Sequence, residues 1–320
     1  MTTDATGRDG PPPLLSYATL ALVILFWSGN FIVGRAVNGV IPPFTLAFVR
    51  WAGAALLVLP FAARHLWADR TVLIANWHRV LLLGLVGVAA FNAFVYSGLR
   101  YTSATNGLLL QAAVPPLVLL FDRTFFGQRT ALLQLLGVLL SILGVMTVVL
   151  RGDLAAILAL DLNFGDLLIM CGVICWSLYT SLLRLRPACH PLSFLTATFI
   201  IAALTMAPLA AHEMMGAHAI PISWPIAGAF AYVAVLPSLV AYFLYNAAVQ
   251  NLGPAPAGQA ITLMPVFGAL LAALLLGERL HLHHLAGMIL IFAGIAIGAW
   301  QAHRNRAEAP SRPRQERIAA

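Results

Sequence analysis

The chain has 320 residues, of which 61% are hydrophobic and only 9% are charged, against roughly 45–50% and 25% in soluble proteins. This composition excludes a soluble globular domain and a disordered chain, and three cysteines exclude a disulfide scaffold. The net charge of +7 comes from arginine alone, because no lysine is present. Single arginines between apolar runs are typical of loops beside a membrane, not of a nucleic-acid-binding protein.

Ten segments are long and apolar enough to cross a membrane, which takes about 20 residues each. In chain order we predict spans over residues 14–34, 42–63, 80–99, 102–123, 130–150, 165–183, 191–211, 226–249, 255–276 and 282–301. The uncharged stretch 214–277 would be about 96 Å long as one helix, so it must reverse direction. Gly253 and Pro254 supply the turn.

The distribution of arginines predicts the orientation of the chain. With the N-terminal tail, residues 1–13, in the cytoplasm, the inside segments hold 13 arginines and the outside loops hold 4. The polar tail 302–320 contains five of the 13. The first span lacks the basic flank of a signal peptide, so we expect it to be retained. Both termini are therefore predicted to be cytoplasmic.

The two halves of the chain match each other at a nearly constant offset. Matching pairs that lie 149 or 150 residues apart are Trp27 and Trp176, Tyr96 and Tyr245, Pro115 and Pro265, Gly137 and Gly287, and Gly144 and Gly294. The repeats cover residues 14–150 and 165–301, with five spans each, so the second crosses the membrane in the opposite sense. The fold class is therefore an all-α polytopic membrane protein of ten transmembrane helices in two inverted five-helix repeats. Such repeats place a substrate site near the midplane and favour transport by alternating access.

Aromatic and amide side chains recur three or four residues apart, on shared helix faces. Because polar groups in lipid are costly, these faces should point into the bundle. The predicted substrate-pathway residues are Trp27, Asn30, Asn92, Tyr96, Asn106, Gln111, Trp176, Tyr179, Tyr242, Tyr245, Asn246 and Gln259. The matching Trp and Tyr pairs are expected on opposite walls of a chamber built by the first, third, fourth, sixth, eighth and ninth spans. Interhelical hydrogen bonding is the alternative role for each residue.

Proline and arginine inside the spans are further candidates. Pro115, Pro116 and Pro265 remove backbone donors, and we interpret them as hinges that line the pathway; a static kink is the alternative. Arg50 could bind a substrate carboxylate through two hydrogen bonds. Alternatively, its side chain reaches the nearer interface or binds carbonyls at a helix end.

Acidic residues are nearly absent from the predicted spans, and Asp122, Asp166 and Glu278 lie at their edges. A buried carboxylate or histidine usually carries the proton in proton-coupled carriers. The sequence is thus as compatible with facilitated diffusion or exchange as it is with proton antiport. The histidines between residues 281 and 284 have no accompanying thiol or acid pair, so we predict no metal site and no cofactor.

Several motifs together resemble the EamA family of the drug/metabolite transporter superfamily. They are Trp27-Ser28-Gly29-Asn30-Phe31, Arg50, Pro115-Pro116, Met264-Pro265, Leu276-Gly277-Glu278-Arg279 and the Gly-x6-Gly pattern that closes each half. Within this family the chain is similar to bacterial amino-acid exporters of the YddG type. The resemblance covers residues 14–301 and implies ten helices, residence in the bacterial inner membrane and outward movement of small metabolites. One departure is Gln128 where the second half has Glu278.

We therefore expect a transporter that exports small neutral or zwitterionic metabolites, amino acids in particular, and is not an enzyme. Its expected partners are the small-molecule substrate and the lipid bilayer, with no nucleic acid. A multidrug or other metabolite efflux carrier is the alternative within transport. An intramembrane enzyme acting on a lipid head group is disfavoured, because the spans offer no converging acids or Ser–base pair. The paired glycines of the fifth and tenth spans could pack on each other or form a homodimer.

Overall fold

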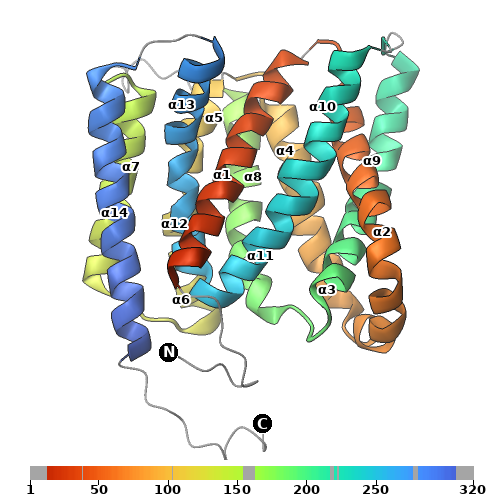
Figure 1. The fold of residues 1–320 in the computed structure, drawn as a ribbon, viewed down its shortest axis with the longest axis horizontal. Coiled ribbons are helices and arrows are strands. Elements are labelled where there is room, and N and C mark those ends of the chain that lie inside the picture. The colour runs from red at the N-terminus through yellow and green to blue at the C-terminus, as the bar shows by residue number, and fades with distance from the viewer. Residues whose placement is uncertain are drawn as a thin grey trace, which may run out of the picture.

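The computed structural model describes residues 13–37, 39–102, 104–153, 163–216, 220–221, 223–276 and 280–307. Within these ranges the regular structure is entirely helical, and ten helical stretches are long and apolar enough to cross a membrane. This confirms the predicted all-α fold. Helix α1 (Pro13–Ala36) starts at one end of the bundle, and helix α14 (Leu282–Ala307) finishes at that same end (Figure 1). We call this the terminal end and the opposite one the far end.

The five spans of the first half contain seven α-helices, because the third and fourth spans are interrupted. They are α1, α2 (Pro43–Ala75), α3 (Trp77–Leu83) with α4 (Phe91–Gly98), α5 (Ala104–Gln111) with α6 (Val114–Phe126), and α7 (Leu132–Val149). The second half repeats this plan. It contains α8 (Phe164–Leu182), α9 (Pro191–Gly216), α10 (Trp224–Ala234) with α11 (Ala241–Leu252), α12 (Pro254–Ala260) with α13 (Met264–Leu276), and α14.

Three helices run further than their predicted spans. Helix α2 ends at Ala75 rather than near residue 63, α9 ends at Gly216, and α14 continues to Ala307. The charged residues after residue 63 indicated a loop, but the segment contains no glycine or proline, so nothing in it stops the helix before Asn76. The predicted turn at Gly253 is confirmed, with a φ of 91° between α11 and α12.

A π-helical segment interrupts the third span and another interrupts the eighth, at equivalent positions of the two halves. They cover Gly84–Ala90 and Val235–Val240. In the second segment Pro237 has no backbone donor, and the hydroxyl of Ser238 donates to the carbonyl of Val233 at 2.6 Å. Single π-helical turns of this kind are frequent at functional sites. They leave backbone carbonyls available to other partners.

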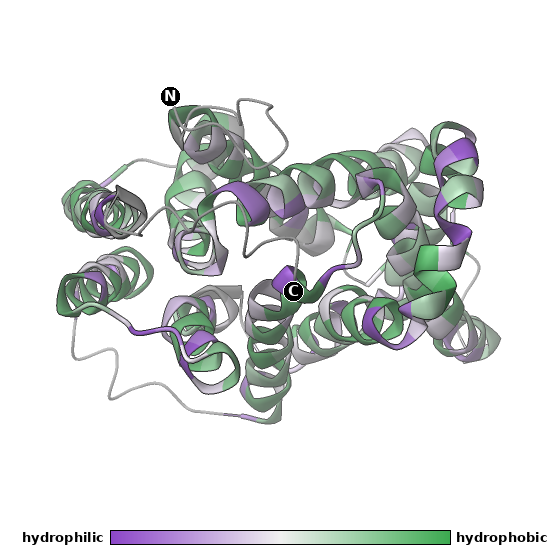
Figure 2. Ribbon diagram, turned by 90° about the horizontal axis from the view of Figure 1, so that it is seen from below, coloured by the Kyte–Doolittle hydropathy of each residue, from purple (hydrophilic) through white to green (hydrophobic). Residues whose placement is uncertain are grey.

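Helices α7 and α14 pack directly on each other through their glycines. A Cβ at Gly144 would lie 2.7 Å from the carbonyl oxygen of Gly287, and one at Gly137 would lie 2.7 Å from that of Gly294. This contact accounts for the paired glycines within one chain. The ribbons seen along the bundle are mainly hydrophobic (Figure 2), and leucines such as Leu139 and Leu143 remain exposed on α7. In a multi-pass membrane protein such faces meet lipid.

Candidate functional site

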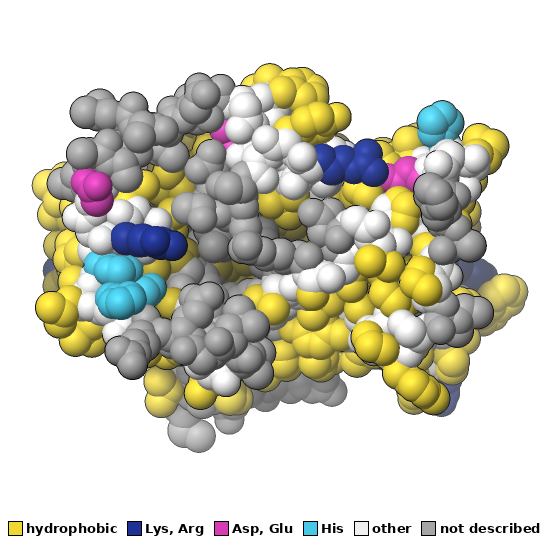
Figure 3. Space-filling model, turned by 90° about the horizontal axis from the view of Figure 1, so that it is seen from above, with side chains coloured by type: hydrophobic (Ala, Val, Ile, Leu, Met, Phe, Trp, Pro, Cys, Tyr) yellow, Lys and Arg dark blue, Asp and Glu magenta, His cyan; other side chains and the backbone are white. Residues whose placement is uncertain are grey.

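A cavity of about 400 Å³ lies between the two halves of the bundle. It is lined by Trp27, Asn30, Gly34, Ile41, Pro43, Leu46, Arg50, Phe91, Asn92, Val95, Tyr96, Leu99, Arg100, Thr102, Gln111, Trp176, Tyr242, Ile261 and Met264. Gly34, Pro43 and Leu99 flank the α1–α2 and α4–α5 connections, so the cavity extends to the far end. The face at that end carries few charged side chains among the described residues (Figure 3).

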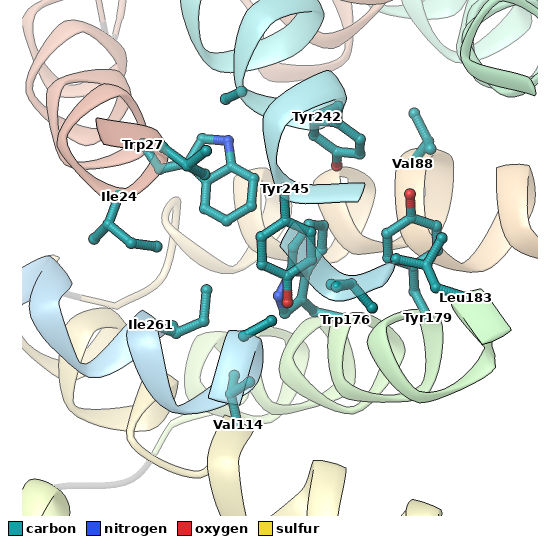
Figure 4. Packing of buried hydrophobic residues seen from close by; sticks show 14 of the residues in the cluster. Ile24, Trp27, Val88, Val114, Trp176, Tyr179, Leu183, Tyr242, Tyr245 and Ile261 are labelled. Carbon is teal, nitrogen blue, oxygen red and sulfur yellow. The ribbon is translucent and has the colours of Figure 1, made fainter. Parts of the chain in front are cut away.

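Aromatic rings form the floor of the cavity (Figure 4). The rings of Trp27 and Trp176 meet edge to face, with centroids 4.9 Å apart, and Tyr242 lies 5.6 Å from Trp176. Tyr245 packs against both indoles, with its ring centroid 5.2 Å from that of Trp27 and 5.1 Å from that of Trp176. The expectation that the tryptophans face each other across a chamber is therefore wrong for this structure. They touch, because bulky rings in a dry interior gain packing and edge-to-face attraction.

A set of polar contacts closes the bundle between this floor and the terminal end, and we call it the terminal seal. Its hydroxyl contacts are Tyr179 to Asn246 at 2.8 Å, Thr180 with Tyr245 at 2.9 Å, and Ser181 to Asp122. Arg184 also forms an ion pair with Asp122 at 2.7 Å. Nearby, a Cβ on Gly258 would lie 3.3 Å from the Cβ of Val118. The seal thus joins α8 to α11 within the second half, and it joins α6 of the first half to α8 and α12 of the second.

Arg50 is the buried cation of the cavity, with only 3% of its surface exposed. Its Nε donates to the Ser238 hydroxyl at 2.5 Å, and its Nη2 donates to the Pro237 carbonyl at 3.0 Å. Its Nη1 donates to Asn92 at 3.1 Å and to the Tyr96 hydroxyl at 2.9 Å. No carboxylate of the described residues forms an ion pair with Arg50. The side chain does not reach the interface, which corrects that alternative, and the π-helical turn at Pro237 provides its carbonyl partner.

Two polar atoms beside the cavity are buried without a hydrogen-bond partner. They are the amide oxygen of Asn30 and the indole nitrogen of Trp176. Asn30 contacts the Tyr96 hydroxyl only through its amide nitrogen, at 3.5 Å. Since an unsatisfied buried polar atom costs about 1–3 kcal/mol, both atoms favour a polar ligand or another conformation.

The structure brings most of the predicted pathway residues to one cavity. Those that line it are Trp27, Asn30, Asn92, Tyr96, Gln111, Trp176 and Tyr242, together with Arg50. Tyr179, Tyr245 and Asn246 lie in the terminal seal instead. Gln259 lies away from the cavity, where its amide donates to Ser141 at 3.3 Å and to the Gly294 carbonyl at 2.9 Å, so it joins helices. The side chain of Asn106 lies outside the described residues, as does Glu278.

The second span also lines the cavity, through Pro43, Leu46 and Arg50, although it is not among the six spans that we predicted to build the chamber. This is a correction to the expected set of six lining spans. At the start of α2, near the far end, Glu213 of α9 accepts from the Thr45 amide at 2.9 Å. Glu213 also pairs with Arg100 at 3.2 Å. Sequence reasoning missed this acid because it ended the seventh span at residue 211.

The predicted proline breaks are present in both halves. Helix α5 ends at Gln111, and α6 starts at Val114 with Pro115 and Pro116 in its first turn. Pro265 follows a 3-10 turn, Ile261–Leu263. Gln111 and Ile261 line the cavity beside these breaks. Their role as hinges stays a prediction.

The acids at the span edges are engaged in structural contacts. Asp122 belongs to the terminal seal, whereas Asp166 caps α8 with Asn163 and accepts from Thr102 at 2.5 Å. Thr102 lies at the far-end rim of the cavity. The two acids therefore occupy opposite ends of the bundle, and neither lines the cavity.

Comparison with known proteins gives one consistent result. The model of the EamA-like transporter family matches residues 14–150 and again 163–299, which confirms two repeats. An uncharacterized transporter of Bacillus subtilis, YyaM, is 27% identical over 87% of this chain and 92% of its own length. The uncharacterized inner membrane transporter YedA of Escherichia coli is 26% identical over 88% and 89%.

A solved crystal structure has the same fold. It superposes with a TM-score of 0.71 and covers 91% of this chain and 98% of its own, at 18% sequence identity. At this identity the likeness concerns the arrangement of helices alone.

Proposed function

This chain belongs to the EamA-like transporter family and is a multi-pass membrane transporter, and on that premise we propose that it exports amino acids. The observation that carries this proposal is the cavity between the halves, which combines aromatic rings, amides and a single unpaired cation, Arg50. Its volume of about 400 Å³ falls in the range of roughly 300–1,000 Å³ that small-molecule sites occupy.

Arg50 also favours amino acids over the alternative substrates. A buried guanidinium repels an organic cation, which disfavours efflux of cationic drugs. A phosphorylated metabolite needs several cations for its charge, and Arg50 is the one arginine in the depth of the described cavity, with Arg100 at its rim. A zwitterion brings one carboxylate and remains neutral overall.

The proposed mechanism is alternating access. The cavity extends to the far end, while the aromatic floor and the terminal seal close the other side. If both termini are cytoplasmic in the bacterial inner membrane, as the arginine distribution predicts, the far end faces outward. Export then requires the inverted repeats to exchange conformations, which opens the terminal seal and closes the far-end mouth.

Flux measured in proteoliposomes tests this function. Purified protein is expected to exchange external labelled phenylalanine for internal phenylalanine, with and without a pH gradient. A rate that does not depend on the gradient supports exchange or facilitated diffusion, and a dependent rate supports proton antiport. The aromatic cation tetraphenylphosphonium should not compete. Absence of flux for all twenty common amino acids would refute amino-acid transport.

A further inference from the structure

We propose that the cavity contains a zwitterion site in which Arg50 and Tyr96 bind the carboxylate of an α-amino acid and Asn30 binds its ammonium group. This inference rests on the proposed function and adds which chemical groups of the substrate are required. It disfavours amines, esters and N-acylated derivatives, which keep the side chain of the amino acid but lack one of its two charged groups.

The four hydrogen bonds of Arg50, which lines the cavity, leave one of its donors unused. A guanidinium has five N–H groups, and four are used by Ser238, Asn92, Tyr96 and the Pro237 carbonyl. The remaining one is on Nη2. These four acceptors are neutral, so they orient the guanidinium without cancelling its charge. A buried cation without a counter-ion is costly, and a substrate carboxylate supplies the missing negative charge.

Tyr96 joins the two halves of the proposed site. Its oxygen accepts from Arg50 at 2.9 Å and lies 3.5 Å from the amide nitrogen of Asn30. Because both contacts use the tyrosine oxygen as acceptor, its own proton is available to donate to a carboxylate. Asn30 is only 9% exposed, and its amide oxygen has no hydrogen-bond partner. This oxygen is an acceptor for an ammonium group. Groups that can donate to a substrate carboxylate and a group that can accept from a substrate ammonium thus lie around the Tyr96 oxygen.

Binding of phenylalanine and three analogues to the purified full-length protein tests the site. Phenylalanine methyl ester and phenethylamine lack the carboxylate, and N-acetylphenylalanine lacks the ammonium group. Wild-type protein is expected to bind phenylalanine at least tenfold more tightly than each analogue. A charge-assisted hydrogen bond accounts for roughly 10- to 100-fold in affinity, so Arg50→Gln should weaken phenylalanine by that factor and the ester by less than twofold. Asn30→Leu should weaken phenylalanine but not its N-acetyl derivative.

The outcomes separate this site from the proposed function. If wild-type protein transports phenylalanine but Arg50→Gln binds it equally well, the site is refuted and amino-acid transport stands. If Arg50→Gln weakens phenylalanine and its ester alike, Arg50 supports the fold rather than the carboxylate, which also refutes the site. Arg123→Gln, a substitution at an exposed position of α6, is the matched control for loss of one arginine. Melting temperatures identify any misfolded variant, and Arg50→Met then serves as a second, uncharged replacement.

Discussion

The ion pair in the terminal seal gives a quantitative prediction about the equilibrium between the two states. Asp122→Asn removes the charge from the 2.7 Å contact with Arg184 and keeps an acceptor for Ser181. The side chains of Asp122 and Arg184 are 8% and 27% exposed. A charged hydrogen bond contributes about 1.5–3 kcal/mol, and the solvent around Arg184 favours the lower value. We expect a loss of about 1.5 kcal/mol, or roughly a tenfold shift toward opening at the terminal end.

The assay is the labelling rate of Val118→Cys in detergent-solubilised protein without native cysteines. Val118 is 0% exposed beneath the seal, so labelling measures the minor population that is open at the terminal end. Asp122→Asn should raise the rate about tenfold. Arg123→Gln, which changes the charge of the adjacent exposed residue, should not. Equal rates in the two variants, at unchanged melting temperature, would refute the assignment of Asp122 to the seal.

Three further substitutions test the packing. Gly144→Ala should lower the melting temperature, because its Cβ meets the Gly287 carbonyl at 2.7 Å and overpacking costs about 1–3 kcal/mol. Gly268→Ala is the control, because a Cβ at this position would meet no atom within 4 Å, and it should leave the melting temperature unchanged. A Gly144→Ala protein as stable as this control would contradict the α7–α14 contact. Asn163→Ala removes the α8 cap and should cost about 1 kcal/mol, measured by thermal unfolding; an unchanged melting temperature would count against the cap. Gln259→Ala should lower stability but leave the flux KM for phenylalanine within twofold, whereas a tenfold increase would place Gln259 in the pathway.

Much of the fold follows from the sequence because lipid imposes simple requirements. Length and hydropathy set the number of spans, and the recurrence of Trp27 as Trp176 identified the repeat. The breaks at Pro115 and Pro265 follow from a missing backbone donor. These features depend on local chemistry or on self-comparison, so no knowledge of tertiary contacts was needed.

The details of the site depend on tertiary contacts and could not be predicted in the same way. Sequence spacing placed Trp27 and Gln259 on interior faces, but not which neighbour each face meets. Gln259 faces two helices instead of the cavity. The π-helical turn at Pro237 was also missed, although a proline within a span removes a hydrogen bond of the helix. That turn decides where Arg50 points.

The most direct test of the account is a disulfide across the terminal seal. Val118 and Gly258 come from different halves, and the Cβ separation of 3.3 Å is close to the roughly 3.5–4.5 Å of disulfides. In protein without native cysteines, Val118→Cys with Gly258→Cys should bind phenylalanine when oxidised but not transport it, and reduction should restore transport. Each single variant should be insensitive to the oxidant. Undiminished transport by the fully cross-linked protein would contradict alternating access through this cavity.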